Sequence, residues 1–316
     1  MFLASDYLRH HSIETSFDEG SINSFVILSE IEQSIKEKIE KVGTPLKDWD
    51  IQINYGIKTG FNEAFIIDGK TKDELIGKSP KNAEIIRPIL RGRDIKKYGY
   101  EFANLWLLYI PWHFPLHKNP LISGASKEAE AEFQKQYPDI YNHLLQYKTQ
   151  LSNRNKSETG IRYEWYALQR WGANYMDDFF KQKIIFQEMV QEPSFTFDKE
   201  GEFFCLDTAR IITGNDIDYL IAIFNSNLFF FAVKTFYGGG GLGATGVRMK
   251  HTFFENFHCP KLNEKNKQIL TELVVQTFNS YKNNTMEYVE KQINKVIYNI
   301  YNISNEEIEF IESQDT

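Results

Sequence analysis

The stretch that sets the fold reads IQINYGIKTGFNEAFII from residue 51 to residue 67. Apolar and polar residues alternate in it up to a turn at Lys58-Thr59-Gly60, after which the pattern resumes as a second strand. A second segment, residues 84–98, reads EIIRPILRGRDIKKY and crowds five cations around a single acid, Asp94. Those cations are Arg87, Arg91, Arg93, Lys96 and Lys97. A sheet that presents such a cluster favours a polyanionic ligand, although cations also gather at solvated helix ends.

Length and charge limit the class of protein. The 316 residues are enough to bury a full core and to form two lobes. A net charge of −7 argues against a protein that coats nucleic acid with uniform positive charge. A local basic cleft is compatible with it, because charges beyond roughly 10 Å are screened. The aromatic content of 15% is high, and aromatic rings serve cores, interfaces and base stacking alike.

Cysteine usage and hydropathy point to a cytoplasmic protein without a membrane partner. Cys205 and Cys259 stand alone, which argues against a disulfide framework or a structural zinc site. No basic and apolar leader opens the sequence. The longest apolar run, 228–233, is far shorter than the roughly 20 residues that a membrane span needs.

Periodicity and turn residues give a coarse secondary structure. They predict helices over 31–42, over 126–151 with a break at Pro138, over 216–236, and from about 264 onward. They also predict a short helix that starts at Thr71 and another that starts at Ser79-Pro80, with Ile85, Ile86 and Ile89 on one face. They predict strands at about 50–55, 63–67, 104–110 and 183–190, and a hairpin that joins 194–197 to 202–205. Residues 1–28 show no clear period, so we interpret them as a linker or a cut N-terminus. We expect an α+β domain over 29–260 and a helical subdomain over 261–316.

A glycine-rich run separates the last two parts of that pattern. Glycine has no Cβ and lets backbone amides approach a phosphate. The run is not a Walker A loop, because the Gly-Lys-Ser/Thr ending is absent, and it follows a helix where a dinucleotide fingerprint would follow a strand. DNA or phosphate contact and a plain connecting loop both stay open. The glycines concerned are Gly238, Gly239, Gly240, Gly241 and Gly243.

Carboxylates and histidines give weaker signals. Glu188, Glu192 and Asp198 are similar to the paired acids of a nuclease metal centre, but no lysine follows at the usual spacing. The seven histidines show no ligand spacing, and no catalytic triad can be picked out. We therefore expect no metal site and no catalytic residue in this chain.

A set of sequence blocks, taken in their order along the chain, resembles the target-recognition domain of type IIG restriction–modification enzymes, which is the TaqI-like C-terminal specificity domain. The resemblance runs from about Glu30 to the C-terminus, and it rests on the set because any single block is weak. The blocks are YGIKTG at 55–60, NEAF at 62–65, RP at 87–88, LRGRDI at 90–95, KIIFQE at 183–188, DTARII at 207–212, the segments 220–226 and 229–245, and FHCPK at 257–261.

The resemblance implies an α+β fold in which a mixed-sheet DNA-recognition domain precedes a helical C-terminal subdomain. In such enzymes an adenine-specific DNA methyltransferase uses S-adenosylmethionine, and a nuclease uses Mg²⁺. This sequence has no Asn-Pro-Pro-Tyr-like methylation motif and no nuclease signature. The chain is therefore expected to recognise double-stranded DNA without catalysis of its own. Its partner would be a methyltransferase or endonuclease domain or subunit that carries both cofactors.

Candidate contacts follow from the two terms of DNA recognition, phosphate neutralisation and base readout. The residues expected to face phosphates are Lys58, Thr59, Arg91, Arg93, Lys96, Lys97 and Lys250. The candidate base readers are Arg162 and Arg170, which lie among aromatic residues, and Arg248. Arg210 lies inside a family block and could instead be a buried, paired arginine.

Two rival functions stay open. The helical tail, with its stripe of Val289, Ile293, Val296 and Ile300, could make the chain a subunit that docks a methyltransferase. Alternatively, the chain could be a metal-dependent nuclease with an unrecognised site near Glu188.

Overall fold

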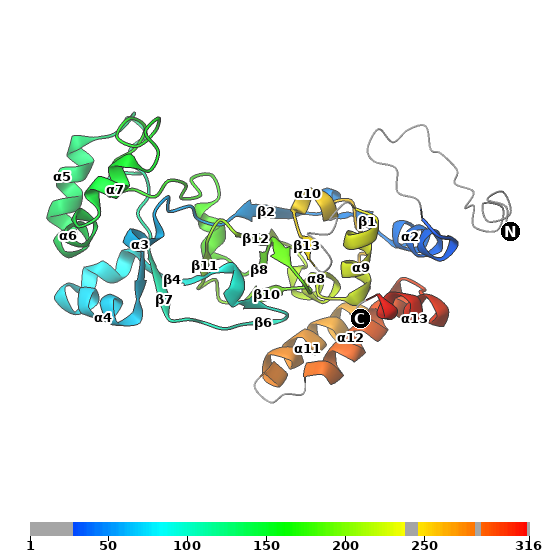
Figure 1. Cartoon of the computed structure of the whole chain (residues 1–316). Coiled ribbons are helices and arrows are strands. Elements are labelled where there is room, and N and C mark those ends of the chain that lie inside the picture. The colour runs from blue at the N-terminus through cyan, green and yellow to red at the C-terminus, as the bar shows by residue number, and fades with distance from the viewer. Residues whose placement is uncertain (1–27, 238–245, 282–285, 315–316) are drawn as a thin grey trace, which may run out of the picture.

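The structure is a computed structural model that describes residues 28–237, 246–281 and 286–314 (Figure 1). These residues form an elongated body with helices at both ends and β-sheets between them. The predicted α+β class is confirmed, and one of the two four-stranded sheets is mixed.

The central sheet is antiparallel and has the strand order β10-β8-β12-β2. In it, Arg210 of β12 lies opposite Tyr55 of β2 on one side and Phe186 of β8 on the other. The predicted strands at 50–55 and 183–190 thus meet through the segment that contains Arg210. The bounds are β2 Ile51–Tyr55, β8 Lys183–Gln187, β10 Phe195–Asp198 and β12 Ala209–Gly214.

The second sheet has the order β11-β4-β7-β3, with β11 parallel to β4 and the other pairs antiparallel. The predicted strand at 63–67 is wrong in its first half. Residues Asn62–Phe65 form a helical turn, α3, because the Thr59 hydroxyl fixes the start of that turn through the Phe61 amide and Asn62. The bounds are β3 Ile66–Asp68, β4 Ile86–Leu90, β7 Leu105–Leu108 and β11 Phe204–Cys205.

Two other local predictions are wrong for physical reasons. The helix predicted from Ser79-Pro80 is a 3₁₀ turn, Pro80–Ile85, followed by β4, because β-branched residues and the residue before Pro88 favour an extended chain. The predicted hairpin does not form: β10 pairs with β8 and β11 pairs with β4. Asp198 accepts the amides of Glu202 and Phe203, and this closes the intervening loop without a ladder.

Short strands and helices complete the body. Helix α2 forms where its periodicity predicted a helix, and it begins at a capping box made by Ser29 and Glu32. Helix α4 is capped by Asp68, three residues before the predicted start. The helices are α2 Glu30–Val42, α4 Gly69–Lys78, α5 Lys127–Gln136, α6 Pro138–Leu145, α7 Lys148–Asn153 and α10 His251–Phe254. The two-stranded ladders join β1 Thr44–Pro45 to β14 His258–Cys259, β5 Ile95–Lys96 to β6 Gly99–Tyr100, and β9 Met189–Val190 to β13 Val247–Arg248.

The predicted helix over 216–236 is two helices, α8 Ile217–Phe224 and α9 Asn227–Thr235, bent by 65°. Ser226 breaks it, because its hydroxyl accepts the Phe229 amide and so caps a new helix. Within the described ranges no single helix is long and apolar enough to cross a membrane. Only this bent pair, whose side chains are mostly buried in the core, passes such a test by length and composition.

The C-terminal part is helical as predicted, with α11 Glu264–Tyr281, α12 Met286–Ile300 and α13 Asn305–Ser313. Its apolar residues join one core together with α2, α8, α9 and one face of the central sheet. A second core lies between the β4 sheet and helices α5–α7. The division between the two cores therefore runs through the central sheet, and the domain boundary near Pro260 stays a prediction.

Candidate nucleic-acid interface

A cavity of about 470 Å³ opens where the basic segment meets the end of the central sheet. One wall comes from Arg93, Ile95 and Lys96, and the other comes from the end of β8, the segment that follows it and Gly246 before β13. The lining residues on that second side are Gln187, Met189, Val190, Gln191, Glu192, Ser194 and Gly246. The fold thus brings two of the predicted phosphate contacts to one opening.

The basic segment is held by its own acid. The Asp94 carboxylate, 4% exposed, accepts the Arg91 amide at 2.9 Å and the Arg91 guanidinium at 2.8 and 2.7 Å. Burial opposes charge on Asp94, but the hydrogen bonds from Arg91 win and leave the pKa of Asp94 lowered. Arg91 is therefore committed to its neighbour, whereas the Arg93 side chain is exposed and has no hydrogen bond or ion pair with any described residue.

The two lysines of this segment differ in the same way. Lys97 donates to Glu290 of α12 at 2.9 Å, and both side chains are mostly covered. Lys96 stands 3.7 Å from the exposed Glu101, a loose contact in solvent. Lys96 is thus available to a ligand, and Lys97 ties the basic segment to the C-terminal helices.

Strand β13 adds cations beside the cavity. Arg248 is paired in register with Met189 of β9, and the Met249 amide donates to the Glu188 carbonyl at 2.6 Å. The Arg248 side chain is exposed, Lys250 is half-buried, and neither has a side-chain hydrogen bond or ion pair among the described residues. The predicted glycines 238–241 and 243 precede this strand and lie outside the described residues.

An aromatic and cationic cluster around Tyr55 continues this surface. The guanidinium carbons of Arg210 and Arg170 lie 3.8 and 4.8 Å from the centre of the Tyr55 ring. Hydrogen bonding and charge from Arg210, with a smaller contribution from Lys250, lower the pKa of the Tyr55 phenol. Arg210 is 1% exposed and is paired with Glu188. It is therefore the buried, paired arginine that the sequence analysis named as an alternative.

The turn that carries Lys58 and Thr59 is bound to Arg170. Lys58 and Arg170 exchange two backbone hydrogen bonds of 2.9 Å, which leaves the Lys58 side chain exposed beside the Tyr55 cluster. Thr59 is 3% exposed, and its hydroxyl donates to Asn62 at 2.6 Å. A phosphate contact by Thr59 stays a prediction, and its hydroxyl is already bonded within the turn.

Arg162 lies apart from these residues, in the segment that follows α7. It is paired with Glu158 at 2.8 Å and rests on the Trp112 ring, 5.2 Å from its centre. The aromatic residues of this segment that suggested base stacking are buried: Tyr163 and Tyr166 are fully covered, and Trp165 is 7% exposed. These three rings thus belong to the packed interior, and base readout by Arg162 stays a prediction.

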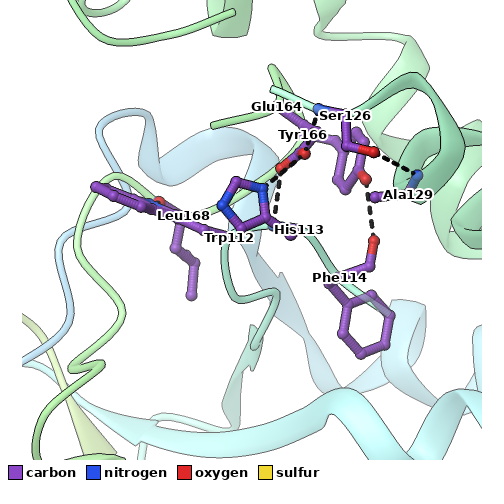
Figure 2. Close-up of polar contacts among 8 residues, drawn as sticks. All are labelled: Trp112, His113, Phe114, Ser126, Ala129, Glu164, Tyr166 and Leu168. Carbon is purple, nitrogen blue, oxygen red and sulfur yellow. Dashed lines mark hydrogen bonds and ion pairs between the residues drawn. The ribbon is translucent and has the colours of Figure 1, made fainter. Parts of the chain in front are cut away.

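Figure 2 shows what fixes that segment. The buried Glu164 accepts the His113 amide at 2.8 Å, lies 3.0 Å from the His113 ring nitrogen, and accepts the Ser126 amide at 2.8 Å. Tyr166 donates to the Phe114 carbonyl at 2.9 Å. One carboxylate thus joins the chain after β7, the start of α5 and the segment of Arg162.

Two of the three carboxylates that suggested a nuclease are paired with cations, and the third, Glu192, is exposed at the cavity. Glu188 is paired with Arg210, and Asp198 is paired with Lys183 at 2.6 Å. Burial lowers the pKa of the Lys183 ammonium, which is fully covered, and the Asp198 carboxylate opposes that shift. In the part of the chain that the structure describes, no three acidic, histidine or cysteine side chains gather as metal ligands would.

Sequence reasoning missed Gln187 and Met189. Both lie in or next to the KIIFQE block, which was interpreted as a plain strand. Met189 is 52% exposed, a high value for a methionine on a strand. The available signal was the break in apolar pattern at Gln187-Glu188, after four covered residues of β8.

The comparisons with known proteins agree with one another. Residues 87–241 match the family described as the TaqI-like C-terminal specificity domain. The type II methyltransferase M.MjaIV of Methanocaldococcus jannaschii is 24% identical over 259 residues, which are 79% of this chain and 79% of that protein.

Two solved structures are similar over most of the chain. The type IIL restriction–modification enzyme MmeI, solved in complex with DNA, matches 86% of this chain and 36% of its own with a TM-score of 0.56 and 12% identity. The type IIG restriction endonuclease BpuSI matches 86% of this chain and 33% of its own with a TM-score of 0.49 and 13% identity. The chain thus spans about a third of each solved enzyme. Residues 87–241 thus match the TaqI-like C-terminal specificity domain, and the chain is similar in sequence to a type II methyltransferase and in fold to a type IIL restriction–modification enzyme.

Proposed function

We propose that this chain binds double-stranded DNA and reads a short base sequence for a type II restriction–modification system. The observation that carries the proposal is a band of four cations whose charges no other described side chain neutralises through a hydrogen bond or an ion pair. The band runs from the Lys58 turn past the Tyr55 cluster to the cavity. Its members are Lys58, Arg93, Arg248 and Lys250.

Connectivity supports a single surface. Lys58 is bonded to Arg170, whose guanidinium lies on Tyr55, and Lys250 is close enough to Tyr55 to lower its pKa in part. Arg248 is two residues before Lys250 and pairs with Met189, which lines the same cavity as Arg93. Because the net charge is −7, such a band would be the local exception that attracts a phosphate backbone.

Two kinds of contact would contribute to DNA recognition, one to affinity and the other to sequence discrimination. Cations that neutralise phosphates release counterions and give affinity that falls steeply with salt but is blind to sequence. Groups that reach base edges in the major groove would supply discrimination. The band would supply the first kind, and the cavity at its end is where the second kind would act.

Catalysis would belong to the partner. S-adenosylmethionine and Mg²⁺ would bind to a methyltransferase or endonuclease domain or subunit, because this sequence lacks the motif for adenine methylation. The chain would place that partner at the correct base.

A second candidate function, docking of that partner, is favoured by the outer face of the C-terminal helices. A groove of about 350 Å³ lies between α11 and α12, and Leu273 and Val296 are among the residues that line it. Val275 and Tyr288 are 54% and 69% exposed on the same two helices. Docking and DNA binding are compatible, because the two surfaces use different residues.

The test is binding of the full chain to a randomised duplex library, with selection and sequencing at two salt concentrations. We expect an enriched short motif and binding that weakens as salt rises. A protein that binds no duplex at low salt would overturn the proposal. Binding that appears only when a methyltransferase subunit is added would move the docking function to the front.

A further inference from the structure

We propose that Gln187 is a specificity-determining residue whose carboxamide recognises the major-groove edge of an adenine in the bound duplex. The inference rests on the proposed function and adds to it the base and the side chain that reads it. A glutamine carboxamide can donate to adenine N7 and accept from adenine N6 in one bidentate contact, a pattern that no other base offers in the major groove.

The first step is the fixed position of the main chain. Gln187 is the last residue of β8, a central strand of the four-stranded sheet, and it pairs in register with Ala209 of β12. Strand β8 has neighbours on both sides, and the ladder with β10 reaches Phe186, the residue just before Gln187. A side chain on such a rigid element can be aimed with the accuracy that base readout needs.

The second step is the contact with the basic segment. A Cβ atom placed on Gly92 would lie 3.1 Å from Cδ, 3.2 Å from Cγ and 3.4 Å from Nε2 of Gln187. The backbone at Gly92 therefore lies directly against the Gln187 carboxamide, and the bonds between Arg91 and Asp94 hold that backbone in place. Glycine at position 92 allows the close approach.

The third step is that the carboxamide is free. Gln187 lines the cavity, and its side chain has no hydrogen-bond partner among the residues that the structure describes. The amide is half-buried at an opening, so its donor and acceptor face solvent and are available to a ligand. Such a group is favoured where a ligand supplies the missing donor and acceptor.

The fourth step is the apolar neighbour. Met189 lines the same cavity and is 52% exposed, and an adenine–thymine pair presents a thymine methyl group beside the adenine edge. A free carboxamide next to an exposed methionine matches both parts of that pair. Arg93 and Lys96 on the opposite wall would contact the phosphates that flank it.

The test compares the motif selected by the wild-type chain with the motifs selected by three variants. Gln187→Ala should remove the adenine preference at one position, with about tenfold loss of discrimination there and little change elsewhere. Gln187→Glu should shift that position toward cytosine, because a carboxylate accepts from cytosine N4. Gly92→Ala, whose added methyl would have atoms of the Gln187 side chain as its three nearest neighbours, should weaken the same position.

Gln52→Ala is the matched control, a glutamine exposed on β2 of the same sheet that does not line the cavity. Its motif should equal that of the wild type. A Gln187→Ala motif identical to the wild type, or affinity reduced equally for every sequence, would overturn the inference and leave the proposed function intact. Failure of the wild-type chain to enrich any motif would instead overturn sequence reading itself.

Discussion

The cations in the interior of the protein are buried and paired, whereas those on the rim of the cavity are exposed and unpaired among the described residues. Lys183 is fully covered and is bonded to Asp198 and to the Phe179 carbonyl. The side chains of Arg93 and Arg248 are exposed and have no hydrogen bond or ion pair with any described residue. Both kinds of residue occur in or near blocks that resemble the family, so position in a block does not separate them. The difference teaches that the bonding state of a cation, more than its place in a basic stretch, indicates whether a ligand can use it.

The largest effect is expected in the body, at Asp198. Asp198→Ala leaves the Lys183 ammonium buried without its counter-charge and should lower the free energy of unfolding by about 3–5 kcal/mol. Urea denaturation of the full chain measures it. The double variant Lys183→Met with Asp198→Ala removes the stranded charge and should recover much of that stability. A single variant within about 1 kcal/mol of the wild type would contradict the contrast.

Arg154 is a second cation that is bonded within the protein, and its replacement is expected to lower the unfolding free energy by less than the replacement of Asp198. Its guanidinium donates to the Thr59, Trp165 and Ala167 carbonyls, and burial lowers its pKa to about 10. Arg154→Met should cost about 1–3 kcal/mol of unfolding free energy, because buried carbonyls are deprived of their donors. Arg154→Lys, which keeps the charge but not the fork, should lie between the two. Equal unfolding free energies of all three proteins, measured by the same urea denaturation, would show that the hydrogen bonds of Arg154 do not stabilise the fold.

On the rim, the expected effect is on DNA binding. The double variant Arg93→Ala with Arg248→Ala should change unfolding free energy by less than about 0.5 kcal/mol. The slope of log affinity against log salt should become shallower by about 0.9 for each phosphate that the variant no longer neutralises. Titrations of duplex at several salt concentrations measure this. Lys127→Ala, an exposed lysine at the start of α5, is the control and should leave the slope unchanged; an unchanged slope in the double variant would remove these arginines from the band.

The smallest effects separate the two lysines of the basic segment. Glu290→Gln should cost about 1 kcal/mol, because its 2.9 Å contact with Lys97 is mostly covered. Glu101→Gln should cost less than about 0.5 kcal/mol, because the 3.7 Å contact with Lys96 is exposed and screened. Chemical denaturation of both variants side by side gives the comparison, and the reverse order would contradict it.

Much of the fold could be predicted because local chemistry decided it. The isoleucine spacing predicted α2, and Pro138 predicted the break between α5 and α6. The errors occurred where non-local pairing decided the outcome. The alternation around residues 194–205 fits a hairpin, but β11 finds a better partner in β4, more than a hundred residues earlier. No local pattern encodes that choice.

The candidate site was predictable only in part, for a related reason. Sequence shows that Arg91 and Arg93 are basic, but it does not show that Asp94 binds one and leaves the other free. It places Thr59 at a turn, but not its hydroxyl on Asn62. Gln187 has no charge and no motif, and it becomes a candidate only when Gly92 is found against it. Partner and burial state are properties of the folded chain.

The turn from Arg91 to Asp94 has a consequence for evolvability. The bonds that set its backbone join the Arg91 amide and guanidinium to Asp94, and the side chain of Arg93 takes no part in them. Mutations at position 93 can therefore change what the surface offers to a ligand while the turn keeps its shape. A segment built in this way can diverge quickly at its outward position, and lineages can acquire new preferences without first giving up a stable scaffold.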